Sequence, residues 1–110
     1  MNLQLKPKRV ALDMNAAGYT PILGGPPESA NIRSGLVVLQ PSGSVGSHST
    51  ENYEEMIVVL KGEGEMLFND GSVIKLDPHT VAYCPPETEH NVRNCGEGIM
   101  RYIYMVAKAI

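Results

Sequence analysis

Two histidines and one glutamate are the residues of this chain whose types and spacing could do chemistry. His48 follows the flexible segment PSGSVGS, Glu55 lies near the start of an apolar run, and His90 follows the rigid corner CPPETE. Two imidazole nitrogens and one carboxylate oxygen, supplied by separated segments, are a typical set of ligands for a divalent transition metal. We therefore predict that folding brings these three side chains into one pocket.

Each of these residues also has a simpler interpretation. Alone, His48 would be a surface-loop histidine and His90 a residue that ends a corner. Glu55 would be one more exposed acid, and strand parity does not separate it from Glu54, because both faces of that run are apolar. We expect His79, in the turn DPH, to be solvated, and it is left out of the site.

The segments that must position these residues are strands and turns almost throughout. No segment carries apolar residues at helical spacing, and several runs are apolar on both faces, as in an all-β sandwich or barrel. The sequence NDG at 69–71, between two such runs, predicts a hairpin. We predict strands at 32–40, 53–60, 64–68, 72–76 and 99–108, with shorter ones at 80–84 and 90–93.

The length of 110 residues suits a single domain. Within it, we expect residues 1–31 to form an N-terminal arm followed by a Gly/Pro-rich loop, and residues 32–110 to form the barrel. The Gly and Pro content of residues 16–31 argues against a long regular element there.

Composition excludes several classes of partner. The formal net charge is −3 and the only basic cluster is the short KPKR at 6–9, so no nucleic-acid partner is expected. No stretch is long and apolar enough to span a membrane, and the start does not read as an export signal. With two cysteines only, Cys84 in an apolar run and Cys95 in a turn, we expect reduced thiols and a cytoplasmic protein.

The spacing around the candidate ligands resembles a known family. Residues 43–62 read G-x4-H-x-T-x4-E-x6-G, and residues 79–94 read H-x5-P-x-E-x2-H-x3-N. This order resembles the two motifs of the cupin superfamily, G-x5-H-x-H-x3-4-E-x6-G and G-x5-P-x-G-x2-H-x3-N. The resemblance covers residues 32–106. It implies a small single-domain bacterial cupin, an all-β double-stranded β-helix (jelly-roll) barrel with a pocket at its mouth.

The resemblance also implies one metal bound by His48, Glu55 and His90, with Fe, Mn, Ni or Zn as candidates. Thr50 stands where the family has its second motif-one histidine, and a neutral hydroxyl is a poor ligand beside imidazole. The loss leaves a coordination position for water or substrate. Thr50 shares strand parity with His48, so we expect it to line the pocket and hold a bound water.

Two functions fit these features. One is a metal-dependent enzyme, dioxygenase- or isomerase-like, that acts on a small polar molecule. The alternative is a non-catalytic binding module for a sugar or small organic acid, because no nucleophile with its base is evident. If the face of strand 99–108 that carries Arg101 lines the barrel, Arg101 is a candidate clamp for a carboxylate substrate.

A homodimer is a separate expectation. Strands that are apolar on both faces, in so small a chain, suggest that one outer face is covered. The run LQLK at 3–6 and the strand at 99–106 are the segments that we expect to pair or pack across a two-fold axis.

Overall fold

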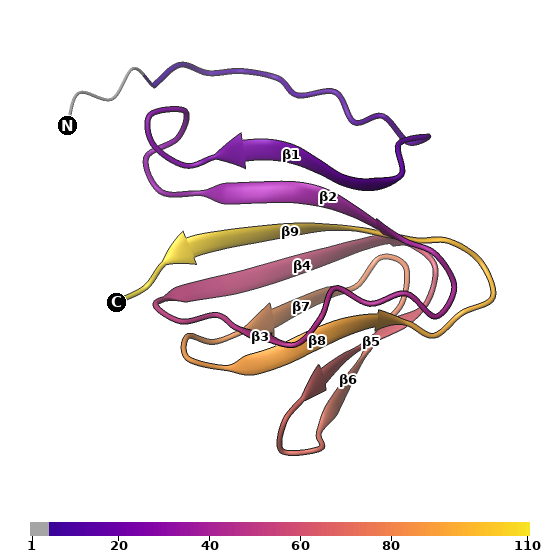
Figure 1. Ribbon diagram of the computed structural model, residues 1–110. Coiled ribbons are helices and arrows are strands. Elements are labelled where there is room, and N and C mark those ends of the chain that lie inside the picture. The colour runs from indigo at the N-terminus through magenta and orange to yellow at the C-terminus, as the bar shows by residue number, and fades with distance from the viewer. Residues whose placement is uncertain (1–4) are drawn as a thin grey trace.

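The computed structural model describes residues 5–110, and it contains nine β-strands and no helix in this range (Figure 1). All seven predicted strands are confirmed, with ends within one residue. The strands are β1 Gly18–Gly24, β2 Arg33–Leu39, β3 His48–Ser49, β4 Tyr53–Lys61, β5 Gly64–Phe68, β6 Val73–Leu76, β7 Val81–Cys84, β8 Glu89–Asn94 and β9 Met100–Lys108. Within the described residues, no helix is long and apolar enough to cross a membrane.

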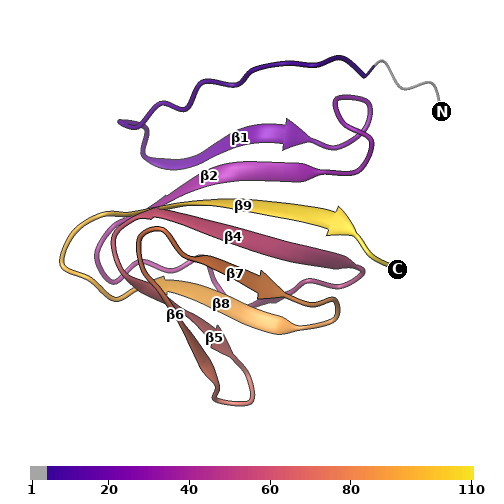
Figure 2. The ribbon, with the colours of Figure 1, turned by 180° about the vertical axis from the view of Figure 1, so that it is seen from behind.

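The strands form two antiparallel sheets that face each other (Figures 1 and 2). The five-stranded sheet has the order β1-β2-β9-β4-β7, and the four-stranded sheet has the order β3-β8-β5-β6. Buried side chains from both sheets pack together between them, among them Ile57 and Tyr102 of the first sheet and Met66 and Val92 of the second. This arrangement is the double-stranded β-helix that the sequence predicts.

The hairpin between β5 and β6 forms at the predicted turn. Gly71 N donates to Phe68 O at 3.0 Å, and the Asp70 carboxylate accepts from Ser72 N at 2.8 Å. Gly71 has φ +89°, a conformation that L side chains rarely adopt. The turn therefore uses its glycine and its aspartate as the sequence indicates.

Strand β1 lies in the segment where we expected no long regular element. It pairs with β2, and the register shifts between Pro21 and Leu23, since proline has no N–H for the ladder. An edge strand tolerates such a break. Of the run LQLK, residues 3 and 4 lie outside the described residues, and Leu5 and Lys6 are not in a strand.

Strand parity assigns the two faces of the five-stranded sheet. On β9, Tyr102, Tyr104 and Val106 point toward the space between the sheets, so Arg101, Ile103 and Met105 point to the outer face. The register between β4 and β9 carries this assignment across, because Glu55 lies opposite Val106 and Met56 opposite Met105. The inner face holds the candidate site.

Candidate functional site

A cavity of about 350 Å³ opens between the two sheets. Its volume is in the range of small-molecule sites. Both sheets contribute to its wall, and so does the segment before β3. The lining residues are four valines, three tyrosines and the three predicted ligands: Val37, Val45, Val92, Val106, Tyr19, Tyr102, Tyr104, His48, Glu55 and His90.

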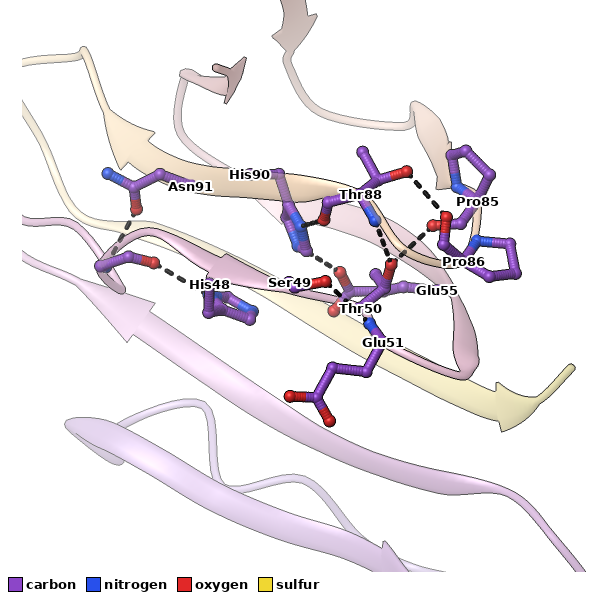
Figure 3. Close-up of polar contacts among 11 residues, drawn as sticks. His48, Ser49, Thr50, Glu51, Glu55, Pro85, Pro86, Thr88, His90 and Asn91 are labelled. Carbon is purple, nitrogen blue, oxygen red and sulfur yellow. Dashed lines mark hydrogen bonds and ion pairs between the residues drawn. The ribbon is translucent and has the colours of Figure 1, made fainter. Parts of the chain in front are cut away.

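His90 is the most buried polar residue of the cavity wall, with 1% of its surface exposed. Its Nδ1 lies 3.0 Å from Thr88 O, and its Nε2 lies 2.8 Å from Glu55 Oε1 (Figure 3). A carbonyl only accepts, so Nδ1 carries a proton, and an ionised carboxylate at Nε2 requires a second one. The hydrogen bond to Glu55 raises the pKa of His90, although burial opposes the charged form.

Strand parity places Glu55 in the cavity and Glu54 outside it, which decides the alternative that the sequence left open. Glu55 is 9% exposed and faces His90, whereas Glu54 accepts a hydrogen bond of 2.8 Å from the Tyr83 hydroxyl on the outer face. The buried carboxylate and the buried imidazole satisfy each other.

His48 lies directly opposite His90 in the ladder between β3 and β8. Its ring centroid is 4.5 Å from that of His90, with an interplanar angle of 52°. The residue is exposed, and Nδ1 donates to Gly46 O at 2.9 Å. A carbonyl oxygen only accepts, so this bond places a proton on Nδ1 and leaves Nε2 as the ring nitrogen that the backbone does not occupy.

Thr50 has a role that differs from the expected one. Its hydroxyl donates to Pro85 O at 2.7 Å and accepts from Thr88 N at 3.0 Å, and the side chain is 8% exposed (Figure 3). Thr50 does not line the cavity. The hydroxyl fastens the β3–β4 connection to the corner between β7 and β8, which is the corner that carries His90.

The donor set agrees in kind with a transition metal. Two imidazoles and a carboxylate line one cavity, and each imidazole is held through Nδ1, as metal-bound histidines usually are. Among residues 5–110, however, no three His, Cys, Asp or Glu side chains are gathered closely enough to form a metal site. The structure joins His90 to Glu55 and places His48 beside them at the cavity edge.

Comparison with known proteins identifies the family. The cupin domain model matches residues 35–106. The chain belongs to the cupin family. No curated relative matches the sequence.

Solved structures agree with this assignment. The cupin 2 conserved barrel domain protein of Salinispora arenicola has a TM-score of 0.77 at 19% identity, over 94% of this chain and 91% of that one. A Bacillus halodurans protein gives 0.79 at 17% identity, over 94% and 84%. The cupin domain of Schizosaccharomyces pombe Cnp3 gives 0.73 at 16%, over 82% of this chain, which spans 63% of that one. Identities this low show the shared fold alone.

This cupin has a pair of tyrosines in its cavity that our sequence reasoning missed. The hydroxyl oxygens of Tyr19 and Tyr104 are 2.7 Å apart, and their rings are stacked with centroids 6.0 Å apart. The sequence feature that could have revealed this tyrosine pair is Gly35, a glycine inside a strand. A Cβ there would lie 2.9 Å from the Tyr19 hydroxyl oxygen, so the absence of a side chain lets Tyr19 lie across β2. Burial is the main cause that raises the pKa of Tyr104.

Arg101 lies outside the site of this cupin. It is on the outer face of β9, opposite in parity to Tyr102, and it does not line the cavity. The prediction of a carboxylate clamp required that the face of strand 99–108 that carries Arg101 line the cavity. That face is the outer one, so the prediction is wrong.

Proposed function

We propose that this cupin binds a divalent transition metal through His48, Glu55 and His90, and beside it a small molecule with an apolar body. The observation that carries the proposal is the shared anchoring of the two histidines. In each of them Nδ1 is held by a backbone carbonyl, which directs Nε2 to the ligand role. When bound, Fe, Mn, Ni or Zn would supply Lewis-acid polarisation of an oxygen of the small molecule.

Binding at this site requires the loss of a proton. The proton that now lies between His90 Nε2 and Glu55 Oε1 must leave before that nitrogen can act as a ligand. Because Glu55 raises the pKa of His90, metal affinity should fall as the pH is lowered. His48 must also turn toward Glu55, and its exposed position leaves room for that change.

The cavity wall narrows the class of small molecule. Four valines supply apolar contact, and the tyrosine hydroxyls supply hydrogen bonds. Burial raises the pKa of both Tyr102 and Tyr104, so these phenols are neutral donors at ordinary pH. A molecule with an apolar body and a carbonyl or hydroxyl oxygen fits this wall better than the small polar molecule that we expected from the sequence.

The test is elemental analysis of protein purified without chelators or affinity metals, followed by calorimetric titration of metal-free protein with Mn²⁺, Ni²⁺ and Zn²⁺. We expect about one metal per chain and its loss in His90→Ala. His79→Asn is the matched control, because His79 lies outside the cavity in a turn at φ +67° that asparagine tolerates. Equal metal content in His90→Ala and wild type would refute the proposal. Oxygen uptake or isomer formation with oxygenated apolar compounds then tests the dioxygenase- or isomerase-like activity.

A metal-free binding module is the second candidate, and one observation favours it. The Glu55–His90 hydrogen bond of 2.8 Å already satisfies both groups, and Thr50 offers no further donor to the cavity. The chain has no tryptophan and five tyrosines, so tyrosine fluorescence reports on ligands at the Tyr19–Tyr104 pair. Ligand affinity that is unchanged by chelation would support the binding module over the metal site.

A further inference from the structure

Tyr102 is the cavity tyrosine whose hydroxyl has no partner within the protein. The residue is 3% exposed and lines the cavity. The hydroxyls of Tyr19 and Tyr104 bond to each other at 2.7 Å, whereas no group among residues 5–110 forms a hydrogen bond with the Tyr102 hydroxyl. Protein atoms do not fully enclose its oxygen, so the hydroxyl opens on the cavity.

The neighbouring strands hold the Tyr102 ring in one place. β9 lies between β2 and β4, and Tyr102 is opposite Val37 on one side and Val59 on the other (Figure 1). All three residues are buried. A ring packed between two valines in a dense core has little freedom to carry its hydroxyl to another partner. The donor is therefore positioned before any ligand arrives, which lowers the entropic cost of binding.

An apolar residue would suit the position of Tyr102 better if packing were its only role. The surrounding core consists largely of aliphatic side chains, among them Val37, Val59 and Met100. Phenylalanine would fill the same space without a polar atom. A buried tyrosine hydroxyl usually has a hydrogen-bond partner, and here the protein supplies none. The partner has to come from the contents of the cavity.

The charge near Tyr102 narrows the kind of partner. Burial, and after it the negative charge of Glu55, raises the pKa of Tyr102, so the phenol keeps its proton and acts as a donor. The Glu55 carboxylate takes its own hydrogen bond from His90. In the metal-free protein an anionic oxygen at Tyr102 would meet the same repulsion from Glu55 as the phenolate does. A neutral acceptor, such as a carbonyl oxygen, does not.

We propose that Tyr102 anchors the ligand of the cavity by donating a hydrogen bond to the carbonyl oxygen of a neutral molecule with an apolar body. The anchor is apart from the predicted metal ligands. Tyr102 lies four positions before Val106, the residue opposite Glu55, which is about 13 Å between Cα positions at strand spacing. The valines of the wall contact the apolar body. This inference rests on the ligand cavity of the proposed function and not on its metal.

Three probes of similar size test the chemistry of the anchored oxygen. Acetophenone carries a neutral carbonyl, ethylbenzene has a methylene in its place, and benzoate has a carboxylate. Each is titrated into the metal-free protein and followed by amide NMR, in which Val37 and Val92 report on the cavity. We expect acetophenone to bind more tightly than the other two. Tyr102→Phe should weaken acetophenone about two- to tenfold, the effect of one hydrogen bond, and should not weaken ethylbenzene.

Tyr53→Phe is the matched control. It makes the same change at a tyrosine that does not line the cavity, and the ring stays beside Arg33. Acetophenone should bind this variant as it binds the wild type. Tyr102→Phe should keep its thermal midpoint within about 3 °C of the wild-type value, because no hydrogen bond within the protein is lost. A much larger fall would reveal a structural partner of the hydroxyl and overturn the assignment.

Three binding results would also overturn it. Acetophenone that does not bind, or binds no better than ethylbenzene, would mean that the hydroxyl holds water only. Weaker binding of acetophenone in Tyr104→Phe, with none in Tyr102→Phe, would place the anchor in the tyrosine pair. Benzoate that binds more tightly than acetophenone would make the ligand an anion. Failure of the metal proposal is distinguishable, because protein that holds no metal can still separate the probes through Tyr102.

Discussion

His48 and His90 are two histidines with the same local hydrogen bond and opposite surroundings. Each holds a carbonyl two residues earlier through Nδ1, at 2.9 Å for His48 and 3.0 Å for His90. They face each other across β3 and β8, yet His48 is exposed and His90 is buried against Glu55. The local bond occupies Nδ1 in both rings, whereas the tertiary contact with Glu55 engages Nε2 of His90 alone.

The largest expected loss of stability comes from removing the buried histidine of this pair, His90. His90→Ala removes the partner of a carboxylate that is 9% exposed, and an uncompensated buried charge costs about 3–5 kcal/mol. Urea unfolding at neutral pH measures the loss in the free energy of unfolding. The control is His79→Asn, which should change stability by less than about 0.5 kcal/mol. A loss in His90→Ala no larger than in this control would contradict the ion pair.

The second-largest loss of stability is expected at the corner between β7 and β8, which positions His90. Thr50→Val keeps the side-chain shape and removes the hydroxyl that bonds Pro85 O and Thr88 N. Pro85 is exposed and Thr88 is half-buried, so water can replace part of the loss, and each hydrogen bond should contribute about 0.5–1.5 kcal/mol. Thermal unfolding should show the loss, and metal titration should show a nearly unchanged affinity, since Thr50 does not line the cavity. A strong loss of affinity with no loss of stability would instead return Thr50 to the site.

The protonation of His90 predicts a pH dependence of stability. Glu55 raises the pKa of His90 in the folded protein above the ordinary value of about 6.5. The stability that this gives is fully present below that ordinary value and is lost as the pH rises through the raised pKa. In the metal-free protein, the free energy of unfolding should therefore fall as the pH is raised from about 6.5 through the raised pKa of His90 in the folded state.

Glu55→Gln tests the cause of that slope. It removes the carboxylate that is the largest contribution to the raised pKa, so the NMR titration of the His90 ring should move to lower pH and the slope should flatten. Glu54→Gln is the matched control, because the neighbouring acid is on the outer face and bonds Tyr83. Equal titration curves for His90 in the two variants would remove Glu55 as the cause.

The smallest effect on stability is expected from replacing the exposed histidine of the pair, His48. His48→Ala changes an exposed side chain and should alter the free energy of unfolding by no more than about 0.5 kcal/mol. It should still weaken metal binding in calorimetry, because a ligand is lost. Unchanged affinity in His48→Ala would leave His90 and Glu55 as a pair without a third ligand.

The strands and the order of the motifs could be predicted from the sequence because their signals are local. Alternating apolar residues, the turn at 69–71 and the spacing of His48, Glu55 and His90 sufficed for the family and the barrel. Strand β1 escaped prediction because Pro21 lies inside it, and only pairing with β2 holds the segment extended. The two-residue strand β3 is too short to leave a pattern.

The roles of individual side chains depended on contacts between distant segments. Glu55 and Glu54 are equivalent in a strand that is apolar on both faces, and pairing with β9 and β7 decides which of them meets His90. Thr50 has the parity of a pocket residue, yet the corner at Pro85 takes its hydroxyl. Tyr19 reaches Tyr104 across 85 positions of sequence. Residue types and spacing thus determined the fold and the candidate ligands, because these follow from local backbone preference and periodicity. Only the tertiary structure decided orientation, burial and protonation, because these depend on which strands pack side by side.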